Sequence, residues 1–360
     1  MRLLAVNLNY LGDALFTTPA LATLRERNPS VTLDVLCGER AAAILKGNPH
    51  IDRLLTRPPH GGAGRATTLA RTLYAGRYDA VVLFQSTFSN AMLSWLNRVP
   101  VRIGFARDGC QPFLTHALEP RRPQEHIVDA YSRLASVWGE AGGERFADAQ
   151  RLSVFVSEAD RGFARDFLCR HEVAPPVVGL VIGATRPQKR WSEEYWVHLT
   201  EKLWKQAGTC SILLGGPEES DAAARIQAQV SAPLVSAVGK TTEKQLAALV
   251  EQLQVVVSGD SGPLHIATAM GTPVVAIFGS TDPAETGPWQ SQNGEVSPAT
   301  VLYDAFACAP CRKSPTCEER FDCLRAITPE RVYDAVCELL NIQTPRLSLP
   351  MATMGQGGER

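Results

Sequence analysis

The sequence predicts an α/β protein with two domains, each a parallel sheet covered by helices on both faces. Short apolar runs alternate with helix-like stretches in two series, and 360 residues are long for a single core. A proline-containing segment at 172–176 separates the two series. We therefore expect an N-terminal domain over 1–172, a C-terminal domain over 177–342 and a disordered tail over 343–360.

The two series predict the individual elements in chain order. Five apolar runs predict the strands of the first sheet: Leu3–Leu8, Val31–Cys37, Arg53–Leu55, Ala80–Phe84 and Val101–Phe105. Helices are expected between them at Ala14–Arg27, Thr67–Tyr74 and Phe88–Leu96. The strands of the second sheet are expected at Val177–Ile182, Ser211–Leu214, Leu234–Val238, Val255–Ser258 and Val274–Phe278. Its helices are expected at Glu193–Gln206, Asp221–Val230 and Glu243–Gln252.

The composition favours an ordinary cytoplasmic enzyme. Lys and Arg (36) nearly balance Asp and Glu (37), so bulk charge argues against a nucleic-acid partner. No apolar run approaches the roughly 18–20 residues of a membrane span. Asn7, Asn9 and Asp13 interrupt any signal-peptide core. The sequence leaves open a peripheral contact with the inner face of a membrane.

A strand, a polar turn and a short helix follow one another at 255–270. Asp260, Ser261 and Gly262 form the turn, and His265 falls in the first helical turn. The N-terminus of a helix presents unpaired N–H groups and favours negative charge, so this turn is a candidate phosphate site. The alternative is an ordinary connection between a strand and a helix that binds no ligand.

This stretch resembles the nucleotide-sugar signature of the heptosyltransferases, glycosyltransferase family 9. The matching positions are Asp260, Ser261, Gly262, His265, Ala267, Ala269, Pro273, Val275, Phe278, Gly279, Thr281 and Pro283. The resemblance extends over residues 1–340 and implies the GT-B fold, in which two Rossmann-like domains face each other across a cleft.

A second motif, Asn9–Leu15, directly follows the first predicted strand. It is not the G-x-G-x-x-G of a dinucleotide site. From the residues alone, Asp13 suits the N-cap of the following helix. The resemblance implies that Asp13 is instead the general base that takes the proton of the acceptor hydroxyl.

Two further loops follow predicted strands of the second domain. Gly183–Trp191 contains Thr185 and ends in Lys-Arg-Trp. The resemblance implies that Lys189 is the cation that binds a diphosphate. The alternative is that the Lys-Arg pair is a solvated surface feature. Trp191 is expected to pack and fix the loop. Leu214–Glu218 is a glycine-rich turn in which the resemblance assigns Glu218 to the nucleotide ribose, the alternative being a solvated turn residue.

Four cysteines cluster as C-x₂-C-x₅-C-x₅-C, at Cys308, Cys311, Cys317 and Cys323. In a cytoplasmic protein disulfides are not expected, so the spacing leaves either a structural zinc site or free thiols. A related segment occurs in only some family members, so we do not expect it to be essential for transfer.

The resemblance therefore implies an inverting glycosyltransferase, and we expect it to use no cofactor or obligatory metal. The expected donor is a nucleotide sugar, ADP-heptose, and the expected acceptor is a lipid-linked or soluble saccharide of the lipopolysaccharide core or a related glycan. A GT-B-like nucleotide-sugar epimerase and a catalytically silent sugar-binding protein are the alternatives.

Overall fold

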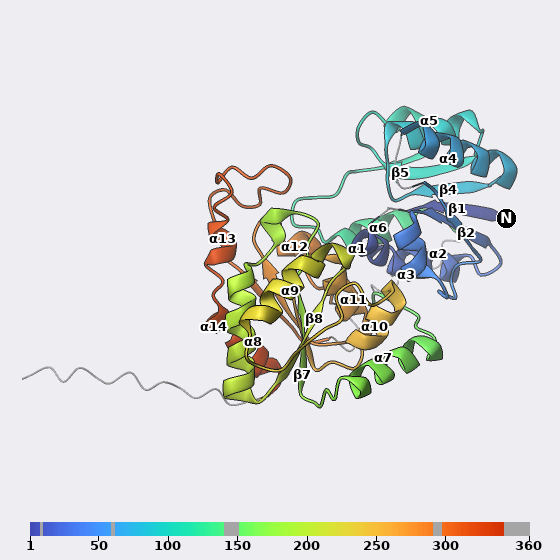
Figure 1. Cartoon of the computed structure of the whole chain (residues 1–360). Coiled ribbons are helices and arrows are strands. Elements are labelled where there is room, and N and C mark those ends of the chain that lie inside the picture. Colours follow the sequence, from blue (N-terminus) through green and yellow to red (C-terminus); the bar gives the residue numbers. More distant parts are fainter. Residues whose placement is uncertain (8–9, 59–61, 140–150, 291–296, 342–360) are drawn as a thin grey trace, which may run out of the picture.

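Two six-stranded parallel sheets form the framework of the protein (Figure 1). The computed structural model describes residues 1–7, 10–58, 62–139, 151–290 and 297–341. The strand orders are β3-β2-β1-β4-β5-β6 and β12-β11-β10-β7-β8-β9, and all neighbouring strands in the described ranges pair in parallel. The predicted α/β class is confirmed, while the predicted tail over 343–360 lies outside the described residues.

The first sheet and its helices span the N-terminal third of the chain. The strands are β1 (Arg2–Val6), β2 (Thr32–Cys37), β3 (Arg53–Thr56), β4 (Ala80–Leu83), β5 (Val101–Phe105) and β6 (His116–Leu118). The helices are α1 (Leu11–Phe16), α2 (Thr18–Arg27), α3 (Glu39–Leu45), α4 (Gly62–Gly76), α5 (Phe88–Leu96) and α6 (Ile127–Ser136).

The second sheet follows after α7 (Glu158–Arg170). Its strands are β7 (Val177–Val181), β8 (Cys210–Leu214), β9 (Leu234–Ser236), β10 (Val255–Gly259), β11 (Val274–Phe278) and β12 (Ala299–Tyr303). Its helices are α8 (Glu193–Ala207), α9 (Ser220–Gln229), α10 (Glu243–Val250), α11 (Gly262–Met270), α12 (Pro283–Thr286), α13 (Asp322–Arg325) and α14 (Pro329–Leu339). None of the helices in the described ranges is both long and apolar enough to span a bilayer.

Two sequence expectations about elements are wrong for identifiable reasons. The single helix expected at Ala14–Arg27 is broken at Thr17, which caps the C-terminus of α1 and the N-terminus of α2. Pro19 in the first turn of α2 has no N–H, so it cannot continue the helical hydrogen bonds of α1. The edge strands β6 and β12 were not expected, because their half-exposed residues form no buried apolar run.

α7 precedes the expected domain boundary but packs on the second domain. It lies against α10, and Arg161 Nε is 2.9 Å from a carboxylate oxygen of Glu251. The boundary between 172 and 177 itself stays a prediction.

The strand orders determine where a ligand can bind. In the first sheet the order reverses between β1 and β4, and in the second between β7 and β10. Ligands of open parallel sheets bind beyond the carboxyl ends of the strands at such a switch point. The loops that follow β1, β7 and β10 are therefore the places to look for a site.

A buried carboxylate stabilises the first sheet away from those loops. Asp34 of β2 is fully buried, and its oxygens accept hydrogen bonds from Arg53 Nε (3.0 Å), Tyr78 Oη (2.6 Å) and Arg2 NH2 (3.2 Å). Burial alone would raise the pKa of Asp34, but the bonds from Arg53 and Tyr78 outweigh it and hold the pKa below its ordinary value.

We expect Asp34→Ala to lower the free energy of unfolding by about 2–3 kcal/mol at neutral pH, because it leaves the tyrosine and two arginines without their acceptor. Because the folded pKa of Asp34 is depressed, its contribution is present above the unfolded pKa and is lost as pH falls through the folded one. Urea titrations across pH measure both effects. Asp166→Ala, at an exposed site on α7, should change stability by no more than about 0.5 kcal/mol. An equal loss in the two variants would contradict this assignment.

Candidate functional site

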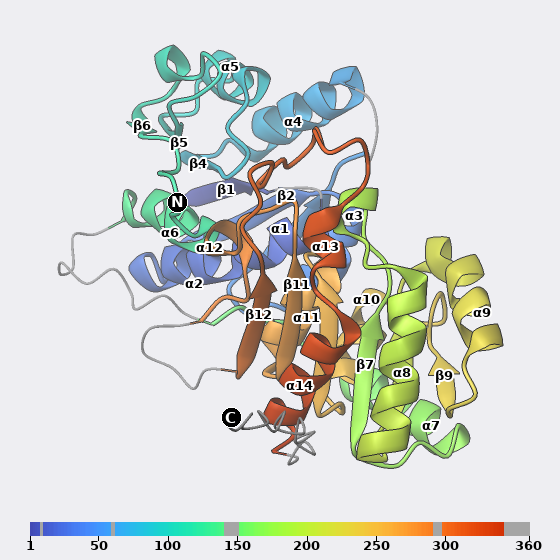
Figure 2. The ribbon, with the colours of Figure 1, turned by 90° about the vertical axis from the view of Figure 1, so that its left-hand side faces the viewer.

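Three loops from two domains meet at the candidate site. One is the start of α1 after β1, one is the turn at Pro187–Lys189 after β7, and one joins β10 to α11. α1 lies against α11, so the first domain contacts the second at this point (Figures 1 and 2).

The side chain of Asp260 links the loops of the second domain at the candidate site. Its side chain is 8% exposed, and Oδ2 accepts hydrogen bonds from Lys189 Nζ (2.5 Å) and Thr281 Oγ1 (2.6 Å). His265 Nε2 lies 3.8 Å from Oδ1. Asp260 does not cap α11, because Ser261 is the N-cap residue. It holds the turn instead, by joining three loops that are far apart in sequence.

The surroundings of Asp260 keep it ionised. Burial alone would raise its pKa, but His265 and the charge of Lys189 outweigh that effect and bring the pKa far below the ordinary value of 3.8. With its proton gone and Oδ2 engaged by two donors, Asp260 is a weak base and a weak nucleophile.

Asp13 stands on the other side of the domain interface. It is the third residue of α1, whose N-cap is Tyr10, so the N-cap reading of Asp13 is wrong. Burial raises the pKa of Asp13 above 3.8, while the charges of His265 and Lys189 lower it. Two carboxylates in one site therefore have pKa values displaced in opposite directions, a pattern typical of acid–base chemistry. Asn9 of the same motif lies outside the described residues.

Two glycines allow the domains to approach each other. A Cβ on Gly12 would lie 2.9 Å from His265 Cδ2, and a Cβ on Gly262 would lie 2.9 Å from Leu11 Cδ2. The Phe16 ring also packs on His265, with ring centroids 4.3 Å apart. Gly262 is not among the positive-φ residues, so its backbone conformation does not require glycine. Glycine is needed at 262 because a larger side chain would collide with Leu11 of the first domain.

The second-domain motif at 183–191 delivers one cation to the site. Lys189 reaches Asp260, whereas Arg190 turns back and donates to the Ala184 carbonyl (2.8 Å). Trp191 is buried and donates to the Ile327 carbonyl, so it packs as expected. Thr185 in this loop is exposed and makes no contact that bears on its predicted role.

The glycine-rich turn after β8 contains two adjacent acids with different contacts. Glu218 is exposed and its carboxylate accepts a hydrogen bond from Arg40 NH2 of the first domain at 2.9 Å. Glu219, which the sequence analysis did not consider, accepts a hydrogen bond from the Gly216 N–H (2.8 Å). Its carboxyl group packs so closely on Gly183 that a Cβ there would collide with it. Glu219 therefore contacts the loop after β7, which is one of the loops of the candidate site, whereas Glu218 contacts the first domain.

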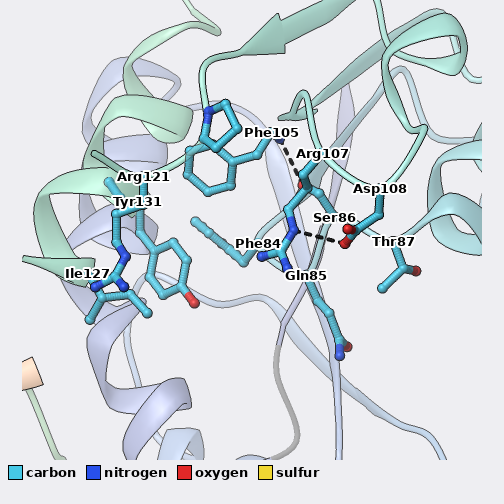
Figure 3. Close-up of a pocket in the computed structure, with 12 residues that line it drawn as sticks. Phe84, Gln85, Ser86, Thr87, Phe105, Arg107, Asp108, Arg121, Ile127 and Tyr131 are labelled. Atoms are coloured by element: carbon cyan, nitrogen blue, oxygen red, sulfur yellow. Dashed lines mark hydrogen bonds and ion pairs between the residues drawn. The ribbon is translucent and has the colours of Figure 1, made fainter. Parts of the chain in front are cut away.

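A pocket of about 390 Å³ opens in the first domain (Figure 3). It lies beyond the carboxyl ends of β4 and β5 and against α6. Its lining residues are Phe84, Gln85, Ser86, Thr87, Phe105, Arg107, Asp108, Pro120, Arg121, Ile127, Ala130 and Tyr131. The Phe84 and Tyr131 rings meet edge to face at 5.2 Å. Such an aromatic wall beside polar groups suits one face of a sugar ring.

Helix α6, which lines the pocket, contacts α1, the helix that contains Asp13. Burial and then the charge of Asp13 raise the pKa of Tyr131, while Arg121 and Arg107 lower it, so Tyr131 lies within electrostatic range of Asp13. Arg121 also forms an ion pair with Glu285 of α12 in the second domain, at 2.8 Å. The sequence analysis missed this pocket because its residues come from several separate segments that share no motif.

The four clustered cysteines are free thiols in this structure. Within the described ranges, no three His, Cys, Asp or Glu side chains are placed to hold a metal ion. The segment does reach the site, because the Arg312 carbonyl accepts a hydrogen bond from Gln188 Nε2 at 2.9 Å.

Comparison with known proteins identifies similar sequences. The model of glycosyltransferase family 9 (heptosyltransferase) matches residues 66–321. Lipopolysaccharide heptosyltransferase 2 of Salmonella typhimurium is 25% identical, and the match covers 95% of this chain and 99% of that protein. Lipopolysaccharide heptosyltransferase 1 of Pseudomonas aeruginosa is 27% identical, with coverage of 92% and 96%.

Solved structures share the fold. A glycosyl transferase family 9 structure from Veillonella parvula DSM 2008 matches with a TM-score of 0.81 and 25% identity, covering 94% of this chain and 97% of that one. E. coli heptosyltransferase WaaC with ADP gives 0.66 at 22% identity, covering 94% and 100%. A UDP-GlcNAc 2-epimerase from Methanocaldococcus jannaschii gives 0.52 at 10% identity, covering 96% and 94%. The expected GT-B fold, two Rossmann-like domains facing across a cleft, is confirmed.

We expect Gly262→Val to push α1 away from α11, because its side chain would collide with Leu11. Small-angle X-ray scattering should show a larger radius of gyration than for the unmodified protein. Adding Leu11→Ala should reverse the change, and Gly162→Val on α7, where only Arg165 comes within 4.0 Å of a Cβ, should have no effect on the radius. Unchanged scattering from Gly262→Val would show that the two helices do not depend on this contact.

Proposed function

The chain belongs to glycosyltransferase family 9, the heptosyltransferases, and from this premise we propose that it transfers heptose from ADP-heptose to a saccharide of the lipopolysaccharide core. The protein is a glycosyltransferase. Support for the donor comes from the WaaC complexes with ADP and with ADP-2-deoxy-2-fluoro heptose, and support for the acceptor from relatives named as lipopolysaccharide heptosyltransferases.

The observation that carries the proposal is the pair of carboxylates across the domain interface. Asp13 has a raised pKa and Asp260 a strongly lowered one. A carboxylate with a raised pKa is the better base at the pH of the cell, because its proton affinity is closer to that of the group it must deprotonate. Asp13 is therefore the base for the acceptor hydroxyl.

The second domain would bind the diphosphate of the donor. Lys189, the Ser261 and Gly262 N–H groups and His265 surround the N-terminus of α11. Negative charge that develops on the departing diphosphate is stabilised by these donors. Transfer would proceed on these side chains and N–H groups without a metal or other cofactor. Thr185 and Glu218 stay predicted contacts of the nucleotide.

The first domain, predicted over 1–172, would bind the acceptor. The pocket at β4, β5 and α6 is lined by α6, which contacts the helix of Asp13, so a saccharide seated there would present a hydroxyl to the base. The attack comes from the first domain and the diphosphate leaves toward the second. A single displacement along that line inverts the anomeric carbon.

The two alternatives have weaker support. The epimerase shares only the fold at 10% identity. A silent sugar-binding protein would have no use for both Asp13 and Lys189 at the interface of the domains. A location on the cytoplasmic side, with peripheral contact to the inner membrane, remains part of the proposal.

We expect Asp13→Asn to retain ADP binding and to lower the transfer rate by about 10²–10⁴-fold, because the amide cannot accept the proton. Calorimetry with ADP and a transfer assay separate the two effects. In the unmodified enzyme, the rate should fall as pH decreases through the raised pKa of Asp13. Unimpaired transfer by the variant would exclude Asp13 as the base.

We expect Lys189→Ala to weaken ADP binding by about 1.5–3 kcal/mol and adenosine binding much less, since the ammonium acts on the diphosphate. The loss is enlarged because Asp260 is left without its cation and repels phosphate. Arg190→Ala is the matched control, because its side chain donates to the Ala184 carbonyl and should leave ADP affinity almost unchanged. Equal losses for ADP and adenosine would place Lys189 outside the diphosphate site.

A further inference from the structure

Helix α5 exposes an apolar face to solvent. Phe88 is 48% exposed, Trp95 is 49% exposed and Leu96 is 55% exposed. Residues seven and eight positions apart lie on one face of a helix, so these side chains form a single stripe. Most large apolar side chains of this protein are buried, and a gathered exposed set marks an interaction surface.

The stripe is an ordered aromatic cluster. Phe113, from the short turn at Gln111–Phe113, meets Phe88 edge to face at 5.2 Å and Trp95 at 5.7 Å. We call Phe88, Trp95, Leu96 and Phe113 the α5 face. Aromatic rings packed in this way present a fixed apolar area of the kind that inserts at the boundary between lipid headgroups and acyl chains.

The segment that contains α5 and the neighbouring helix α4 is positively charged. Residues 62–98 contain four arginines and one acidic residue, in a chain whose net charge is −1. Neither α4 nor α5 contains an acidic residue. Arg71 on α4, Arg77 and Arg98 are exposed. An apolar face with arginines around it complements the surface of an anionic bilayer.

The α5 face lies next to the acceptor pocket and far from the second domain. Figures 1 and 2 show α4 and α5 at the end of the first domain that points away from the second sheet. Thr87, the N-cap of α5, lines the pocket, and Phe88 follows it directly. A bilayer on α5 would therefore lie beside the pocket mouth.

We propose that the α5 face docks the protein on a bilayer containing anionic phospholipid, and so presents the pocket to a saccharide that is anchored in that bilayer. The docking follows from the exposed rings and the arginines. Only its purpose, reaching a lipid-linked acceptor, rests on the proposed function.

The test is co-sedimentation of the full chain with vesicles. Vesicles of phosphatidylcholine alone are compared with vesicles in which about one third of the lipid is phosphatidylglycerol. We expect the unmodified protein to bind the anionic vesicles, and binding to weaken as salt concentration rises. The double variant Phe88→Ser, Trp95→Ser should bind at least tenfold more weakly, whereas Trp204→Ser, at a 41% exposed tryptophan on α8 of the second domain, should bind normally.

Two results would overturn the proposal. One is an unmodified protein that stays in solution with both kinds of vesicle; the other is a double variant that binds like the unmodified protein. If the unmodified protein ignores vesicles and instead forms dimers that the double variant loses, the α5 face is a contact between copies of the chain. Circular dichroism and ADP affinity, expected to be unchanged, show that the double variant is folded.

A parallel assay with a soluble, delipidated acceptor separates this inference from the proposed function. Vesicle binding without transfer to any acceptor would reject the proposed function and still support the docking face. Normal transfer to the soluble acceptor by the double variant, with slower transfer to a lipid-linked acceptor in vesicles, supports both.

Discussion

The contact between Lys189 and Asp260 is the interaction on which the site depends. A largely buried lysine without an anionic partner would be costly, and a buried aspartate without a cation would tend to be protonated. Together they are stable, and Thr281 adds a hydrogen bond that joins a third loop. The pair fixes Lys189 near the N-terminus of α11, where the ammonium and the helix dipole would act on the same anion in the proposed donor complex.

The same pair determines which carboxylate can do chemistry. Asp260 is held ionised by Lys189 and His265, so it has little tendency to take a proton. Asp13 carries no comparable ion pair among the described residues, and burial makes it the more basic of the two. The difference between the two pKa values depends on the contact between the domains, because α1 carries Asp13 and lies against α11. That contact is possible because Gly12 leaves room for His265 and Gly262 leaves room for Leu11.

The sequence was sufficient to predict which residues gather at the candidate site, because loops that follow parallel strands converge on one edge of the sheet. Asp13, Lys189, Asp260 and His265 come together for that reason. It was not sufficient to assign Asp260, because a carboxylate beside phosphate is unfavourable until its partner, 71 residues away, is known. The reason for glycine at 262 lies across the domain interface, which local patterns do not encode. The pocket at β4, β5 and α6 has no motif for the same reason: its walls come from separate segments.

The stereochemistry of transfer tests the central claim most directly. A site with one available base and a neutralised second carboxylate performs a single displacement, whereas retention requires a nucleophile that forms a covalent intermediate. Nuclear magnetic resonance of the product formed from ADP-heptose gives the anomeric configuration. The account predicts the configuration opposite to that of the donor. A product with the donor's own configuration would contradict it, because a second side chain would then have to act as the nucleophile.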